Sequence, residues 1–188
     1  PVCDAMPTTT TTTTTAAATR RAPATTRARR RACATRAASE PRSRALFASD
    51  DRGIVLYDGV CNLCNGAVNF ALRHDRDRAR GSVRFAALQS SVGRALLVEA
   101  GRDADDISSI VYVEASGTAY AKSEAILRIG RDLLGAPFGG AARVAMWAVP
   151  RVVGDWVYDR VADNRYSILG RRDECRFGDD EDDDRFLA

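Results

Sequence analysis

Two cysteines three positions apart, Cys61 and Cys64, are the residues of this sequence whose type and spacing best suit chemistry. They follow an apolar run that ends in an Asp-Gly pair, and the next dozen residues carry apolar side chains at helical spacing without proline. This pattern predicts a strand, a tight turn and a helix whose first turn holds both thiols. Because positions i and i+3 of a helix face the same side, the two thiols can close a small disulfide. The spacing is typical of a redox-active pair.

The two cysteines are predicted to have different roles. Free N–H groups and the positive dipole end at a helix N-terminus favour a thiolate there. The first cysteine of such a pair is usually the more exposed, whereas the second lies one turn in and can attack a mixed disulfide. We therefore assign Cys61 as the nucleophile at a surface edge and Cys64 as the resolving thiol.

Asp58, three residues before the first cysteine, is the third candidate catalytic residue. Its carboxylate could accept a proton or tune the thiols. It could equally hold the Asp-Gly turn by bonding backbone N–H groups. A nearby carboxylate raises the pKa of a thiol and a helix dipole lowers it, so the sequence leaves the sign of the net effect open.

A zinc site and an inert pair are the alternatives to redox chemistry. Tetrahedral zinc needs four ligands, and beyond residue 49 the candidates are Cys61, Cys64, Cys175 and His74. His74 would lie about three helical turns from the pair, at about 1.5 Å per residue. No His follows the pair directly, so covalent haem attachment has no support. We therefore expect no metal and no bound cofactor, with Cys175 as an unpaired residue.

The elements that would position the pair alternate along the chain. Strands are predicted at 54–57, 83–88, 107–113 and 118–121, and helices at 65–75, 91–100, 124–134, 141–149 and 154–162. The order βαβαββα predicts an α/β, thioredoxin-like sheet with helices on its faces, and the last two helices form a cap over about 139–165. Ser123 is predicted to cap the helix at 124–134. Cys61 would follow the C-terminal edge of the first strand, a usual position for reactive groups.

The first 49 residues differ in composition from the rest. They hold nine Arg and two acidic residues, and an unbroken Thr run spans 8–15. The whole chain has 28 basic and 25 acidic residues, so residues 50–188 contain 19 basic and 23 acidic residues. The net charge of +3 therefore comes from this leader. A Thr/Ala/Arg-rich, acid-poor segment without an apolar stretch indicates an organelle transit peptide, with chloroplast favoured over mitochondrion by the Thr run. A plain disordered tail, an over-extended start and a nucleic-acid-binding arm are the alternatives.

We expect three parts: a disordered leader at 1–49, a domain at 50–177 and a disordered acidic tail at 178–188. The basic cluster at 27–31 has no interleaved aromatic residue for base stacking, so we predict no nucleic-acid partner. The most apolar stretch, 144–149, is far shorter than the roughly 20 residues of a spanning helix. No transmembrane segment is predicted.

With these residues in place, the chain resembles the DCC family of thiol-disulfide oxidoreductases, named for an Asp and two Cys in the pattern D-G-x-C-x-x-C. The resemblance covers about 53–176 and continues through the blocks at 85–90, 122–125, 149–150, 155–158 and 164–170. It implies a thioredoxin-like fold and disulfide oxidoreductase activity, with Asp58, Cys61 and Cys64 as signature residues. The loop at 103–108 lacks the proline that thioredoxins place before the third strand, which puts substrate docking by that loop in doubt.

The function predicted from the sequence is protein-disulfide exchange through a mixed disulfide at the Cys61/Cys64 pair. Ser123 and Arg165 are candidates for the edge where the substrate docks. The substrate would be a disulfide-containing protein or a small thiol, with electrons from a thioredoxin- or glutathione-type donor. The alternative is a non-enzymatic thioredoxin-like adaptor that binds a protein or a membrane surface through its C-terminal helices.

Overall fold

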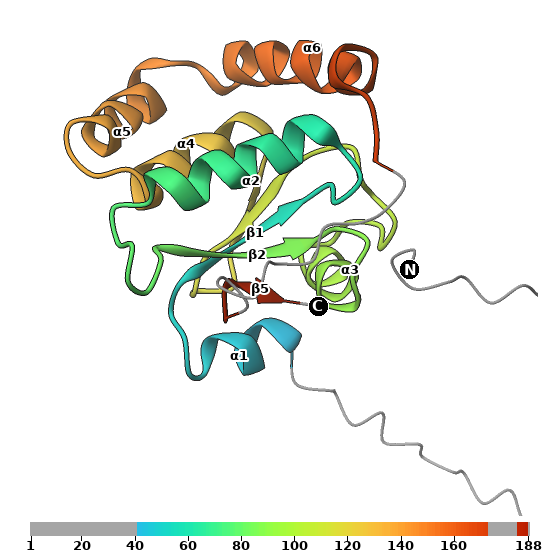
Figure 1. The fold of residues 1–188 in the computed structure, drawn as a ribbon, viewed down its shortest axis with the longest axis vertical. Coiled ribbons are helices and arrows are strands. Elements are labelled where there is room, and N and C mark those ends of the chain that lie inside the picture. The colour runs from blue at the N-terminus through green and yellow to red at the C-terminus, as the bar shows by residue number, and fades with distance from the viewer. Residues whose placement is uncertain (1–40, 173–183, 188) are drawn as a thin grey trace, which may run out of the picture. The chain divides into compact units, whose positions relative to one another are not determined.

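A five-stranded mixed sheet is the centre of the fold (Figure 1). The computed structural model describes residues 41–172 and 184–187. The strand order is β4-β3-β1-β2-β5, with β1 parallel to β2 and antiparallel to β3. The strands are β1 (Gly53–Tyr57), β2 (Val83–Ala87), β3 (Val111–Val113), β4 (Ala119–Ala121) and β5 (Phe186–Leu187). The α/β, thioredoxin-like fold class predicted from the sequence is confirmed.

Helices cover both faces of the sheet, and further helices form an outer layer (Figure 1). They are α1 (Arg42–Phe47), α2 (Asn62–His74), α3 (Ser91–Glu99), α4 (Lys122–Leu133), α5 (Phe138–Ala148) and α6 (Arg151–Leu169). The helices α5 and α6 lie beside α4 and α2 rather than on the sheet itself. Within the part of the chain that the structure describes, no helix is both long and apolar enough to cross a membrane.

All five residues of β1 are buried because the strand contributes to a core on each side of the sheet. Ile54 and Leu56 pack with apolar residues of α3 and with the end of α1. Val55 and Tyr57 pack with apolar residues of α2 and α4 on the opposite face. Side chains alternate between the two faces of a strand, so this continuous apolar run fits a strand buried on both sides.

The predicted boundaries need three corrections. The third strand begins at Val111 rather than at 107, because the carbonyl groups of residues 107 and 108 bond a side chain of α6 instead of a neighbouring strand. The last helix runs from Arg151 to Leu169, since no proline occurs between Pro150 and Gly170 and the helix continues through Gly154. Ser123 is not an N-cap: α4 begins at Lys122, and the Ser123 hydroxyl donates to Asp155 of α6.

Two segments predicted to be disordered contain regular structure. The helix α1 lies within 1–49, and the strand β5 lies within 178–188. Composition suggested disorder, but Leu46 and Phe47 pack against the core, and the Phe186 ring stacks on Phe85 at 5.5 Å. The rest of the leader, residues 1–40, lies outside the described residues, as does most of the tail.

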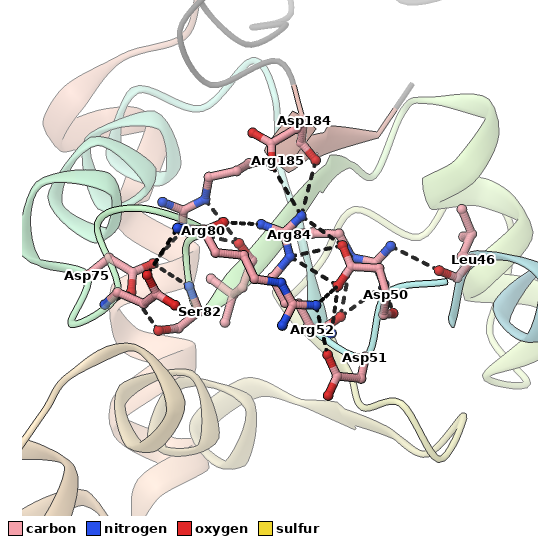
Figure 2. Close-up of polar contacts among 12 residues, drawn as sticks. Leu46, Asp50, Asp51, Arg52, Asp75, Arg80, Ser82, Arg84, Asp184 and Arg185 are labelled. Atoms are coloured by element: carbon pink, nitrogen blue, oxygen red, sulfur yellow. Dashed lines mark hydrogen bonds and ion pairs between the residues drawn. The ribbon is translucent and has the colours of Figure 1, made fainter. Parts of the chain in front are cut away.

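A network of arginines and carboxylates joins these terminal segments to the N-terminal ends of β1 and β2 (Figure 2). Arg52 bonds Asp50 at 2.7 Å and the Asp184 carboxylate at 3.3 Å. Arg84, itself buried, donates to the carbonyl groups of Leu46 and Asp50. This network lies at the strand ends opposite those that lead to the cysteines, so we assign it to stability rather than to the chemistry of the site.

Candidate functional site around the cysteine pair

The cysteine pair lies where β1 ends and α2 begins, as the sequence predicts. Cys61 is the N-cap residue of α2, and Cys64 lies in its first turn. Both thiols are free. Burial, the charge of Cys61 and the charge of Asp58 together raise the pKa of Cys64 to about 12. Cys64 therefore keeps its proton at neutral pH.

The predicted exposure of the two thiols is wrong. Cys61 has no exposed surface, whereas Cys64 is half-buried. The segment that follows α6 lies against the backbone at Cys61: residue 61 pairs with Arg171 in an isolated β-bridge, and the Arg172 N–H donates to the Val60 carbonyl at 2.8 Å. These contacts join residues 110 or more positions apart in the sequence, so local spacing could not reveal them.

Asp58 is a buried carboxylate that collects hydrogen bonds from distant parts of the chain. It is 2% exposed. Its Oδ1 accepts from the Val60 N–H at 3.2 Å, the turn-holding bond considered above, and from Gln89 Nε2 at 2.7 Å. Its Oδ2 accepts from the Tyr166 hydroxyl and, at 3.4 Å, from Arg165 Nη2. The carboxylate thus joins the turn, the end of β2 and α6.

Arg165 connects this carboxylate to the loop before β3. Its guanidinium donates to the carbonyl of Ile107 at 2.9 Å and to that of Ser108 at 3.1 Å. The side chain is 8% exposed, and its Nε has no hydrogen-bond partner within the described residues. Arg165 was expected at the cysteine edge, and the structure brings it to Asp58. An arginine therefore braces the loop that lacks a proline.

Two residues around Asp58, Gln89 and Tyr166, were not predicted from the sequence as site residues. Gln89 also accepts from the Gly59 N–H at 3.1 Å, and so fixes the turn from both sides. Burial and the hydrogen bond to Asp58 raise the pKa of Tyr166, so its hydroxyl remains a donor. Gln89 could have been found as a polar residue just beyond the C-terminal end of β2, next to the end of β1. For Tyr166 the signal was its position beside Arg165.

Asn65 is a further buried polar residue of α2 beside the pair. Its side-chain amide donates to the carbonyl groups of Gly59 and Cys61, both at 2.9 Å. These bonds tie the first turn of α2 to the preceding loop. They hold the backbone of Cys61 in place without contacting either thiol.

An apolar cavity of about 710 Å³ opens beside Cys64. Its walls come from β1, β2 and the helices α2, α4, α5 and α6, and most lining side chains are aliphatic or aromatic. Asp58, Ser123, Tyr158 and Arg165 are among its few polar lining residues. Ser123 thus lies in the same cavity as Cys64, although its hydroxyl bonds Asp155.

His74, the other candidate metal ligand that the structure describes, lies at the far end of α2 from the pair. It stacks on Phe70 and bonds the Phe70 carbonyl. Cys175 lies outside the described residues. Among residues 41–172 and 184–187, no three His, Cys, Asp or Glu side chains gather closely enough to hold a metal ion.

Comparisons with known proteins point to one family. Residues 55–171 match the family described as DCC1-like thiol-disulfide oxidoreductase. The chain is 49% identical over 131 residues to a DCC family protein of Arabidopsis thaliana named as chloroplastic, covering 70% of this chain and 73% of that protein. It is 41% identical over 134 residues to the uncharacterized protein YuxK of Bacillus subtilis strain 168, covering 71% and 93%. No solved structure matches.

Proposed function

This chain belongs to the DCC1-like thiol-disulfide oxidoreductase family, and from that membership we propose that it is an enzyme that exchanges disulfides through a Cys61/Cys64 dithiol pair. The family supports a thiol-disulfide redox role. The observation that carries the finer proposal is the position of two free thiols at the start of α2, one on the N-cap residue and one in the first turn. Two free thiols at a helix N-terminus suit stepwise exchange.

The exchange proceeds in two steps. The Cys61 thiolate attacks one sulfur of a partner disulfide, and the partner's second sulfur leaves as a thiolate. Cys64 then loses its proton and attacks the Cys61 sulfur of the mixed disulfide, which releases the reduced partner and leaves a Cys61–Cys64 disulfide. A thioredoxin- or glutathione-type donor restores the dithiol. Because Cys61 is fully buried, a protein partner reaches it only when residues 170–172 move aside.

Serine variants of the two cysteines test this mechanism. Cys61→Ser should reduce insulin disulfides no faster than the uncatalysed reaction, because no nucleophile remains. Cys64→Ser should accumulate a mixed disulfide, visible as an added mass that a reductant removes. Cys175→Ser is the matched control and should keep full activity. Undiminished activity in both Cys61→Ser and Cys64→Ser would refute the mechanism.

The second candidate function is the non-enzymatic adaptor, and the exposure of the C-terminal helices favours it. Trp147 is 90% exposed, and Val152 and Trp156 are also exposed. Exposed aromatic and aliphatic side chains on helices can bind a protein groove or a membrane surface. Partner capture that survives both cysteine substitutions but not Trp147→Ala would favour the adaptor over the enzyme.

We further propose that residues 1–49 direct the protein to an organelle, to the chloroplast more readily than to the mitochondrion. The composition of this leader and the chloroplastic name of the Arabidopsis relative support this location. The leader fused to a fluorescent protein should accumulate in plastids, whereas residues 50–188 fused in the same way should not. Cytosolic fluorescence of the leader fusion would contradict the proposal.

A further inference from the structure

The cavity beside Cys64 offers a route to the dithiol that does not require residues 170–172 to move. Cys61 is fully buried, but Cys64 is half-buried and lines the cavity. A molecule in the cavity therefore meets Cys64 first. The walls next to it are apolar, with Leu63, Ala67 and Val68 on α2 and Val157 and Val161 on α6. Such walls suit an apolar molecule, and about 710 Å³ is within the range of small-molecule sites.

One buried donor lining the cavity lacks an acceptor. Arg165 is 8% exposed, and its terminal guanidinium nitrogens bond Asp58, Tyr166 and the loop carbonyls, but its Nε is without a partner among the described residues. Leaving a buried donor unpaired is energetically unfavourable. A ligand that places an oxygen acceptor against Nε would satisfy that donor.

The charged and polar groups of the cavity gather around the same thiol. Asp58, Tyr158 and Arg165 line the cavity together with Cys64, and Arg165 bonds Asp58 at 3.4 Å. A ligand oxygen at Arg165 would thus lie in the same cavity as Cys64, while the apolar body of the ligand extends between α2, α4 and α6. The site would therefore hold a ligand with an apolar body and a carbonyl-type oxygen, next to a dithiol that can donate two electrons.

We infer that this cavity binds an apolar electron acceptor of the quinone class, with a ring oxygen on Arg165 Nε and its ring against Cys64 Sγ. The inference rests on the proposed function, because the Cys61/Cys64 dithiol supplies the electrons. A quinone is the class of small molecule that joins an apolar body to carbonyl oxygens and accepts two electrons from thiols. Disulfide exchange with other partners reduces the Cys61/Cys64 pair, and the quinone would then oxidise it again.

The redox step balances within the pair and the quinone. Cys64 gives its proton to a quinone oxygen as its Sγ forms a bond to the quinone ring. The Cys61 thiolate then attacks Cys64 Sγ, so the bond between sulfur and ring breaks and its electron pair stays on the ring. The two protons of the two thiols convert the ring to the hydroquinone. One quinone is reduced for each Cys61–Cys64 disulfide formed.

The first test is anaerobic oxidation of the reduced full-length chain by a fully substituted benzoquinone that carries a decyl chain. We expect one quinone consumed per chain, with a rate that saturates as quinone concentration rises. Val153→Trp should raise the half-saturating concentration at least tenfold, because Val153 lines the cavity and is half-exposed, so a larger side chain fits without disturbing the core. The neighbouring Val152→Trp is the matched control, since Val152 is 81% exposed and lies outside the cavity. A rate that stays linear in quinone, or equal effects of the two variants, overturns the inference.

The second test measures binding without redox chemistry. The Cys61→Ser/Cys64→Ser chain, titrated calorimetrically, should bind the decyl benzoquinone at least tenfold more tightly than the dimethyl ether of its hydroquinone. The ether keeps the apolar body but loses the carbonyl oxygens that Arg165 Nε would bond. Equal affinities would overturn the inference, because the cavity would then take up any apolar molecule.

The two proposals fail in different ways. Insulin reduction that depends on Cys61, together with no saturable oxidation by the quinone, leaves the proposed function standing and overturns the inference. Absence of any reversible Cys61–Cys64 disulfide overturns both. Selective, saturable oxidation by the quinone without any insulin reduction supports the inference. It would also mean that protein disulfides are not substrates of the Cys61/Cys64 pair.

Discussion

At the scale of single residues, Asp58 has the most connections in the site. It holds the turn through Val60, accepts from Gln89, and is the buried partner of Arg165 and Tyr166. The two roles considered from the sequence, turn-former and electrostatic tuner, are therefore compatible. The turn-holding bond is present, and the charge of the carboxylate contributes to the raised pKa of Cys64.

Removing that charge should make Cys64 more reactive. Burial and Cys61 raise the pKa of Cys64 more than Asp58 does. The effect of Asp58 on this pKa should therefore be measured in a Cys61→Ser background, where Cys61 no longer contributes. There Asp58→Asn should lower the pKa of Cys64, and each unit of lowering increases the thiolate fraction at pH 8 about tenfold. The rate of iodoacetamide labelling of Cys64, measured by mass spectrometry between pH 7 and pH 9, reports the change.

The matched control for this prediction is Asp163→Asn, which neutralises an exposed carboxylate on α6. It should leave the labelling rate of Cys64 unchanged. Circular dichroism establishes that the Asp58 variant stays folded. Labelling that is slower, or equal to that of the parent, would show that Asp58 acts through the turn and not through its charge.

At the scale of elements, the site depends on α6 as much as on α2. The start of α2 supplies both cysteines, while α6 supplies Arg165 and Tyr166 and ends in the segment that covers Cys61. That segment begins at Gly170, which has φ 75° and ψ −175°, a conformation that other residues rarely adopt. The conformation of one glycine thus sets the direction of the cover over the first thiol.

Gly170→Ala should loosen this cover and expose Cys61. The added Cβ would meet its nearest neighbour, Asn62 Nδ2, at an ordinary 3.5 Å, so the effect comes from the backbone conformation, at a cost of about 1–3 kcal/mol. Native-state labelling of Cys61, measured in a Cys64→Ser background, should therefore become faster.

Gly140→Ala is the matched control, because Gly140 lies in α5 with open space around it and lacks a positive φ. It should leave the labelling of Cys61 unchanged. If Gly170→Ala also left it unchanged, access to Cys61 would not pass through this segment.

At the scale of the whole molecule, β5 forms one edge of the sheet beside β2, and Asp184 and Arg185 belong to the polar network around the start of both β1 and β2 (Figure 2). Arg185 donates to Asp75 at 2.6 Å, and their side chains are 7% and 0% exposed. It also donates to the Val83 carbonyl, next to the stacked rings of Phe186 and Phe85. A buried ion pair therefore anchors β5, the last strand in the sequence, to the sheet.

Breaking this buried pair should destabilise the entire domain. Arg185→Ala leaves the Asp75 carboxylate buried without its cationic partner, and we expect a loss of about 3–5 kcal/mol in the free energy of unfolding. Urea denaturation followed by tryptophan fluorescence measures it. Arg94→Ala removes an exposed pair with Asp105 and should change stability by less than about 1 kcal/mol. Equal effects of the two variants would mean that β5 is not anchored by this pair.

The sequence by itself determined the features that depend on neighbours along the chain. The apolar run of β1, the Asp-Gly turn and the thiol spacing at the start of α2 are local, and local periodicity and helix geometry predict them. The order of strands and helices followed from the same periodicities, and with it the fold class. The start of β3 and the full length of α6 did not follow from these periodicities, because they depend on contacts between elements.

Only the tertiary structure decided what surrounds the two thiols. Gln89 is 31 positions from Asp58, and Arg165 is 107 positions from it. The cover over Cys61 and the cavity beside Cys64 likewise come from segments remote in sequence. Periodicity describes which side of an element is apolar, but not which remote polar group meets which carboxylate. The exposure of Cys61 was therefore predicted wrongly, because burial is a property of the packed chain.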